Sequence, residues 1–134
     1  MSTSSAASGG AGQAAQLLVD VSGLQSAVER FVRERDWDQF HSPKNLVMAL
    51  TGEVGELSEI FQWLTEEASH AVARDAATAR AVRDELADVL IYLARLAAVL
   101  DVDLDEAVAT KLRANAQRYP VEQVRGSARK QREL

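Results

Sequence analysis

The chain has 134 residues, of which 47% are hydrophobic and 26% charged, with a formal net charge of −5 and a pI near 5.0. This acidic balance argues against broad nucleic-acid binding but leaves a nucleotide ligand open, because a metal and local cations can offset it. The absence of cysteine excludes disulfides and thiolate metal sites and fits a cytoplasmic setting, and no apolar run approaches the ~20 residues that cross a bilayer.

One all-α domain is expected over residues 21–120, preceded by a disordered tail at residues 1–20, which are rich in Ser, Ala, Gly and Gln. The first helix is expected to open at Ser22, with Gln25 completing a capping box, and to run to about Asp36.

The second helix has a strong start signal, with Ser42 as N-cap and Pro43 as its first residue, and is expected to end near Glu67. A turn is expected within residues 68–79, followed by a third helix over residues 80–100. Asp103 and Glu106 form a capping pattern for the fourth helix, which ends before residue 120. Residues 121–134 are expected to be a polar, basic tail.

Two pairs of carboxylates, Glu53/Glu56 and Glu85/Asp88, lie beside the apolar stripes of the second and third helices. Residues three apart are neighbours on a helix, so each pair places two negative charges side by side. Such charges repel each other unless a positive partner lies between them, and a hard divalent cation prefers oxygen ligands. The two pairs therefore predict a metal site suited to phosphoryl or pyrophosphoryl chemistry.

The two helices are expected to pack stripe to stripe as an antiparallel hairpin. The stripes are Leu46, Leu50, Val54, Leu57, Phe61 and Leu64 in the second helix, and Val82, Leu86, Val89, Leu93, Leu96 and Leu100 in the third. Both acid pairs lie on the same flank of their stripes, so the packing is expected to bring all four carboxylates together. The alternative is an ordinary solvated acidic face, which is the expectation for Glu59.

Aromatic and basic residues near these helices are candidates for substrate contacts. An aromatic box for a flat base can be formed by Trp37, Phe40, His41, Trp63 and Tyr92, although each alone is more often a core residue. One face of the fourth helix carries Lys111, Asn115 and Arg118 at helical spacing. Its two cations, Lys111 and Arg118, can hold phosphate oxygens, or the three residues can instead form a solvated face.

Three segments resemble the MazG-like all-α nucleoside triphosphate pyrophosphohydrolases, and most closely their dCTP pyrophosphatase branch. They are RDWDQFHSPKNLVMALTGEVGELSEIFQW, DELADVLIYLARLAAVLDVDL and KLRANAQRYPVEQVRGSARK. The resemblance implies a helical bundle that assembles as a dimer or a dimer of dimers, with active sites between subunits. It implies hydrolysis of dCTP or a modified dCTP to the monophosphate and pyrophosphate.

The resemblance also assigns residues. It implies that the four paired carboxylates bind Mg²⁺, and it implies substrate contacts by Trp37, His41, Trp63, Tyr92, Lys111, Asn115 and Arg118, with Tyr119 a weaker candidate.

Three other interpretations remain open. A carboxylate-bridged di-iron bundle is disfavoured because neither acidic helix has a His three residues after a Glu. A non-enzymatic helical interaction protein would use the apolar stripes only to dimerise. A pyrophosphohydrolase that prefers another nucleotide, such as dUTP, differs in base contacts that the sequence does not locate.

Overall fold

The computed structural model describes residues 16–128, and within that range the chain is all-α, as the sequence predicts, with no strand. The elements are α1 Ser22–Glu34, the 3-10 helix η1 Asp38–Phe40, α2 Pro43–Phe61, α3 Glu66–Ser69, α4 Ala79–Val99, α5 Leu104–Arg118 and α6 Val121–Val124. The four long helices correspond to the four expected ones. None of the described helices is long and apolar enough to cross a membrane.

Two of the expected helix starts are confirmed by their capping hydrogen bonds. The Ser42 hydroxyl accepts from the backbone N–H of Asn45 at 3.2 Å at the start of α2. The Asp103 carboxylate accepts from the backbone N–H of Glu106 at 3.1 Å at the start of α5. Each cap satisfies a backbone donor that has no partner within its helix.

The capping box expected at Ser22 and Gln25 is wrong. Ser22 is the first residue of α1 and donates from its N–H and its hydroxyl to Asp20, at 3.2 and 2.7 Å. The Gln25 side-chain amide instead donates to the backbone carbonyl of Ala94 on α4, at 3.0 Å. Gln25 therefore ties two helices together rather than closing the first turn of its own.

The first two long helices end earlier than expected. α1 stops before Asp36, whose backbone takes the left-handed conformation with φ of 53°. α2 ends at Phe61 and not near Glu67. Thr65 starts the separate helix α3, because its hydroxyl accepts from the N–H of Ala68 at 3.0 Å.

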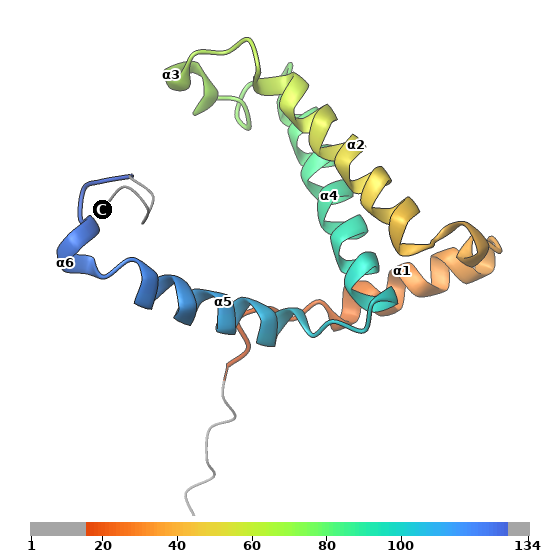
Figure 1. Ribbon diagram of the computed structural model, residues 1–134. Coiled ribbons are helices and arrows are strands. Elements are labelled where there is room, and N and C mark those ends of the chain that lie inside the picture. Colours follow the sequence, from red (N-terminus) through yellow and green to blue (C-terminus); the bar gives the residue numbers. More distant parts are fainter. Residues whose placement is uncertain (1–15, 129–134) are drawn as a thin grey trace, which may run out of the picture.

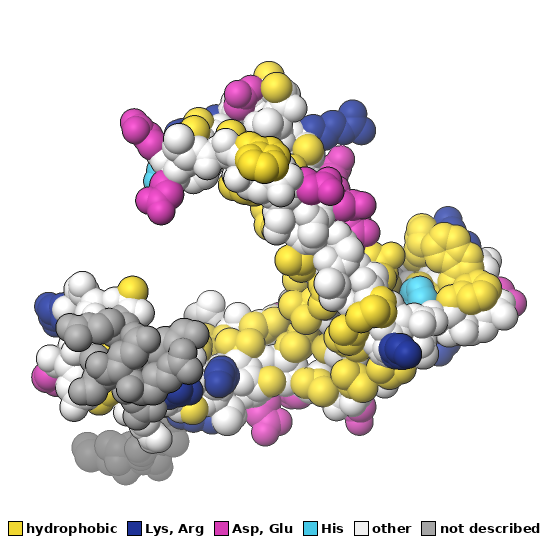
Figure 2. Space-filling model, turned by 45° about the horizontal axis from the view of Figure 1, so that its top comes forward, with side chains coloured by type: hydrophobic (Ala, Val, Ile, Leu, Met, Phe, Trp, Pro, Cys, Tyr) yellow, Lys and Arg dark blue, Asp and Glu magenta, His cyan; other side chains and the backbone are white. Residues whose placement is uncertain are grey.

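α2 and α4 form a helical hairpin and are joined by residues 62–78. α1 packs across the C-terminal end of α4, at the end of the hairpin away from this connection (Figure 1). α5 leaves the hairpin and extends to one side, where α6 follows it. The chain consequently has an open shape, and the space-filling view shows a hollow between the α5–α6 arm and the end of the hairpin that carries α3 (Figure 2).

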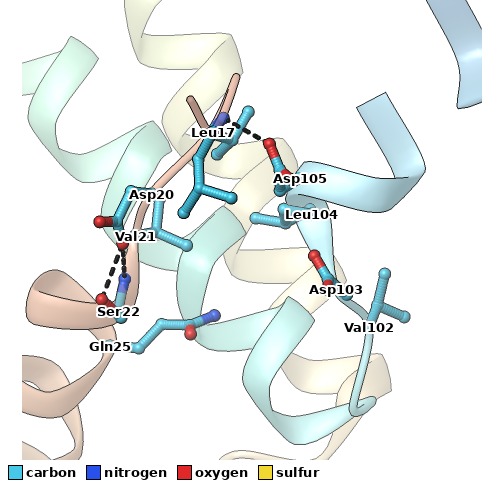
Figure 3. A pocket seen from close by; sticks show the side chains of 10 residues that line it. Leu17, Asp20, Val21, Ser22, Gln25, Val102, Asp103, Leu104 and Asp105 are labelled. Carbon is cyan, nitrogen blue, oxygen red and sulfur yellow. Dashed lines mark hydrogen bonds between the residues drawn. The ribbon is translucent and has the colours of Figure 1, made fainter. Parts of the chain in front are cut away.

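The segment before α1 contacts the beginning of α5. One carboxylate oxygen of Asp105 accepts from the backbone N–H of Leu18 at 2.6 Å and of Val19 at 3.0 Å. Figure 3 shows this segment beside Leu104 and Asp105 at the start of α5, over a pocket that Gln25 also lines. The last part of the expected N-terminal tail is thus held to α5, while residues 1–15 lie outside the described residues.

Few apolar side chains are buried within the described part of the chain: Val32, Leu46, Val72, Val82, Ala94 and Ala97. The expected stripe-to-stripe packing of the hairpin is only partly correct, since Leu86 and Leu93 of α4 are 54% and 40% exposed. The α4 side chain of Glu85, by contrast, is half-buried. The face of α4 that packs against α2 therefore includes Glu85 and leaves part of the apolar stripe outside the contact. Hydrophobic side chains face the hollow between the hairpin and α5 (Figure 2).

Candidate metal centre

The hairpin brings carboxylates from two helices into one site. Glu53 and Glu56 of α2 and Glu85 of α4 each offer one oxygen, and these oxygens all lie within 4.8 Å of one another. The two α2 residues are one turn apart on the same helix face, and the neighbouring α4 supplies the third residue. The predicted convergence of the two acidic motifs is confirmed for these three residues.

Two oxygens of this group are buried and have no described hydrogen-bond partner: Oε2 of Glu53 and Oε2 of Glu85. A buried carboxylate oxygen without a partner is unfavourable, because it has lost its hydration and gained nothing in exchange. Oxygen-only donors that carry negative charge are the ligands that Mg²⁺ and Ca²⁺ prefer. The residues present therefore fit a hard divalent cation.

The pKa values of the cluster reflect the same crowding. Burial raises the pKa of Glu53, a hydrogen bond that only a protonated Glu85 can donate to it lowers it, and the charges of Glu56 and Asp88 raise it further. Burial, followed by hydrogen bonding with Glu53, raises the pKa of Glu85 to about 7. Without a cation, the cluster relieves its charge by holding a proton near neutral pH.

Asp88 lies one turn after Glu85 on α4 and is half-buried. It is not one of the three residues whose oxygens lie within 4.8 Å of one another, although its charge acts on Glu53. Asp88 thus borders the cluster in this structure, and its role as a fourth ligand stays a prediction.

The aromatic candidates do not form a closed box within the described residues of one chain. Trp37 packs edge to face against Phe31 of α1, with ring centroids 5.7 Å apart. Trp63 follows the end of α2 and is 88% exposed, whereas Tyr92 is half-buried on α4. The shared role of these rings in holding a base stays a prediction.

Arg95 links His41 to Asp38, and this network was not predicted from the sequence. Arg95 of α4 donates from Nε to Nδ1 of His41 at 3.2 Å and from Nη2 to the Asp38 carboxylate at 2.7 Å. One signal of this network was visible in the sequence, because Arg95 is the single cation in the apolar run of residues 89–100. A cation in such a run needs a partner near the helix surface.

The three α5 candidates lie on the arm that leaves the hairpin (Figure 1). Lys111 lines a shallow apolar surface with Val102 and Ala107, and the Arg118 guanidinium lies 5.6 Å from the ring centroid of Tyr119. Asn115 accepts the backbone N–H of Tyr119 through its carbonyl at the end of α5. A single chain therefore leaves Lys111, Asn115 and Arg118 on an arm separate from the hairpin.

Residues 49–134 match the model of the MazG-like family. Over 104 residues the chain is 52% identical to dCTP pyrophosphatase 1 of Mus musculus and 50% identical to dCTP pyrophosphatase 1 of Homo sapiens. Both matches cover 78% of this chain and 61% of the relative, so the chain spans about three fifths of the length of these curated relatives.

A similar fold is found in the crystal structure of a pyrophosphatase from Archaeoglobus fulgidus. It superposes with a TM-score of 0.70 at 34% sequence identity, covering 81% of this chain and 99% of that chain. The fold of about four fifths of this chain therefore recurs over nearly the whole of that pyrophosphatase chain.

Proposed function

Because this chain belongs to the MazG-like family, we propose that it hydrolyses a nucleoside triphosphate to the monophosphate and pyrophosphate in a Mg²⁺-dependent reaction. The proposed substrate is dCTP or a modified dCTP, because relatives that share half of their aligned residues with it are dCTP pyrophosphatases. The observation that carries the proposal is the group of three converging carboxylates with two unpartnered buried oxygens.

Glu53, Glu56 and Glu85 would hold Mg²⁺, with Asp88 as the fourth ligand. When bound, the ion supplies positive charge that neutralises phosphate oxygens and lowers the pKa of a water molecule. The protein supplies the fixed placement, since α2 and α4 hold the carboxylates before substrate arrives and little rearrangement is needed.

In the proposed reaction, a water oxygen attacks the α-phosphorus and the bond from this phosphorus to the pyrophosphate oxygen breaks. A carboxylate of the cluster accepts the proton that the water loses. Trp37, Trp63 and Tyr92 would stack against the base, and His41 would bind the nucleoside. Cationic and polar residues of α5 would bind phosphate oxygens: Lys111, Asn115 and Arg118.

We further propose that the working enzyme is a homo-oligomer, a dimer or a dimer of dimers. Large apolar side chains on α4, including Leu86, Leu90 and Leu93, are 40–54% exposed, an unusual amount for a protein that stays a monomer. α5 extends away from the hairpin of its own chain. In the proposed oligomer, α5 of a second copy would therefore bring Lys111 and Arg118 to the carboxylate cluster of the first copy.

The test is pyrophosphate release from a panel of canonical and modified triphosphates, including dCTP, methylated dCTP and dUTP, with Mg²⁺ and with a chelator. Glu53→Gln is the matched variant, because it keeps the size of the side chain and removes its charge. We expect Mg²⁺-dependent release that is greatest for a cytosine nucleotide and lost in Glu53→Gln. Equal activity of this variant would remove the carboxylate cluster from the mechanism, and strongest release from dUTP would reassign the base.

A second candidate function, a non-enzymatic helical interaction protein, is favoured only by the exposed apolar side chains of α4. Stable self-association without pyrophosphate release from any triphosphate on the panel would support that function instead.

A further inference from the structure

Arg95 is almost fully enclosed although it carries a permanent charge. Its side chain is 11% exposed and lies on α4, which packs against both α1 and α2. Its guanidinium bridges Nδ1 of His41, at 3.2 Å, and the carboxylate of Asp38, at 2.7 Å. An arginine held by two partners at fixed angles orients both of them, because its fork of donors is planar and rigid.

The direction of the contact with His41 decides where the imidazole carries its proton. A guanidinium has only donors, so Nδ1 of His41 must present a lone pair to Arg95. The proton of the neutral ring is then on Nε2, to which no hydrogen bond is found within residues 16–128. His41 therefore has one nitrogen occupied by the protein and one N–H available to a ligand.

The charges around His41 oppose its protonation. Burial and the positive charge of Arg95 lower the pKa of His41, against the smaller opposite effect of the Asp38 carboxylate. These two groups, one from α4 and one from η1, are the charged groups that act on the ring. Protonating Nδ1 would also break the hydrogen bond that Arg95 donates to it.

We propose that Arg95 is a positioning residue that keeps His41 as a neutral donor through Nε2, and that His41 thereby recognises an uncharged acceptor on the nucleoside half of the substrate. This inference rests on the proposed function. A neutral ring adds no positive charge for the triphosphate, whereas carbonyl oxygens and ring nitrogens of a base accept such an N–H. The segment that leads to His41 carries two exposed aromatic side chains, Trp37 and Phe40, which suit a flat base.

The first test measures His41 directly and needs no substrate. The chain has two histidines, so ¹H–¹⁵N spectra of the imidazoles separate His41 from His70, which is exposed and serves as an internal reference. We expect an unprotonated Nδ1 and a protonated Nε2 for His41, with a pKa below the ordinary value for histidine. Arg95→Met should move the titration of His41 upwards, because the Asp38 charge is left unopposed. A protonated Nδ1, or a His41 titration that Arg95→Met leaves unchanged, would overturn the proposal.

The second test separates nucleoside recognition from phosphate binding. The amide nitrogen of Gln reaches the position of Nε2, whereas that of Asn reaches only the position of Nδ1. We expect His41→Asn to raise KM for the preferred triphosphate about tenfold, as loss of one hydrogen bond would, with little change in kcat. His41→Gln should have a KM close to that of the unaltered protein. Inhibition by inorganic triphosphate, which lacks a nucleoside, should be the same in both variants.

The two tests distinguish failure of this inference from failure of the proposed function. A parallel loss of affinity for inorganic triphosphate in His41→Asn, or no difference between the Asn and Gln variants, would overturn the recognition role. If the unaltered protein hydrolyses no triphosphate, the proposed function fails and the recognition role fails with it, whereas the spectra still decide whether Arg95 sets the state of His41.

Discussion

Glu53 on α2 and Glu85 on α4 meet across the hairpin, and each has one buried carboxylate oxygen without a described hydrogen-bond partner. Both groups have a pKa above the ordinary value, first because of burial. The carboxylates of Glu53 and Glu85 therefore favour binding of either a proton or a metal cation between the two helices. Proton binding and metal binding should compete, and this competition gives the first prediction.

The stability of the metal-free protein should fall as pH rises through the range in which Glu85 titrates. Its pKa is raised from 4.5 to about 7 in the folded protein, so the folded state holds this proton more tightly than the unfolded chain does. The stabilising contribution is complete below pH 4.5 and is lost as pH rises to about 7. Thermal melts of chelator-treated protein across this range should show a decreasing Tm.

Mg²⁺ should reverse this trend, because it binds the deprotonated cluster and so stabilises the folded state most above about pH 7. Glu85→Gln is the control, since its amide does not titrate, and its Tm should vary less with pH. A metal-free protein whose Tm rises over this range, or a Mg²⁺ effect that is largest in acid, would contradict the competition.

Replacement of the two kinds of acid should have different consequences. Glu53→Gln replaces a charged carboxylate of the group of three with a neutral amide and should abolish turnover. Asp88→Asn changes a residue that borders this group, and we expect Mg²⁺ affinity to fall by about 10–100-fold. Isothermal titration with Mg²⁺ and pyrophosphate release measure the two effects, and circular dichroism checks that the helices remain. An Asp88→Asn protein with unchanged affinity would remove Asp88 from the metal site.

The helix caps and the helix faces that carry the acids depend on residues close together in the chain, so the sequence was enough to predict them. Ser42 and Asp103 were identified as caps because capping depends on a side chain and the N–H groups of the next turn. The meeting of Glu53 with Glu85 was also predictable, since helical periodicity places both acids on corresponding flanks of a hairpin.

Contacts between distant segments could not be predicted in the same way. Gln25 had a plausible local role as a capping residue, but a backbone carbonyl 69 positions away binds its amide in the structure. Arg95 and His41 are 54 positions apart, and neither local pattern indicates the other. The apolar stripe of α4 also predicted burial of Leu86, which is exposed, because periodicity does not show which part of a stripe faces another element of the same chain.

Asp105 should anchor the segment that precedes α1. Its carboxylate accepts two backbone N–H groups from this segment, so Asp105→Ala should lower the free energy of unfolding by about 1–3 kcal/mol. Asp105→Asn, which keeps one acceptor oxygen, should have a smaller effect. Urea unfolding measures both variants, and equal stability of Asp105→Ala and the unaltered protein would show that the segment is not held through this carboxylate.

The exposed face of α4 should be the surface through which copies of this chain associate. Leu90 and Leu93 are 47% and 40% exposed on this helix, and aspartate at position 90 would place an unpaired charge in an apolar contact. We expect Leu90→Asp to weaken self-association at least about a hundredfold, since an unpaired buried charge costs several kcal/mol. Sedimentation equilibrium should show a smaller species over a range of concentrations. Arg80→Asp is the matched control, because its side chain is 94% exposed at the start of the same helix.

If α5 of one copy completes the site of another, Leu90→Asp should lose pyrophosphate release together with its self-association, while Arg80→Asp keeps both. Activity per chain should then rise with protein concentration in the weakened variant, because mass action restores the shared site. A Leu90→Asp protein that sediments as a monomer and hydrolyses its substrate at the full rate would show that each copy forms a complete site, with Lys111 and Arg118 uninvolved across copies.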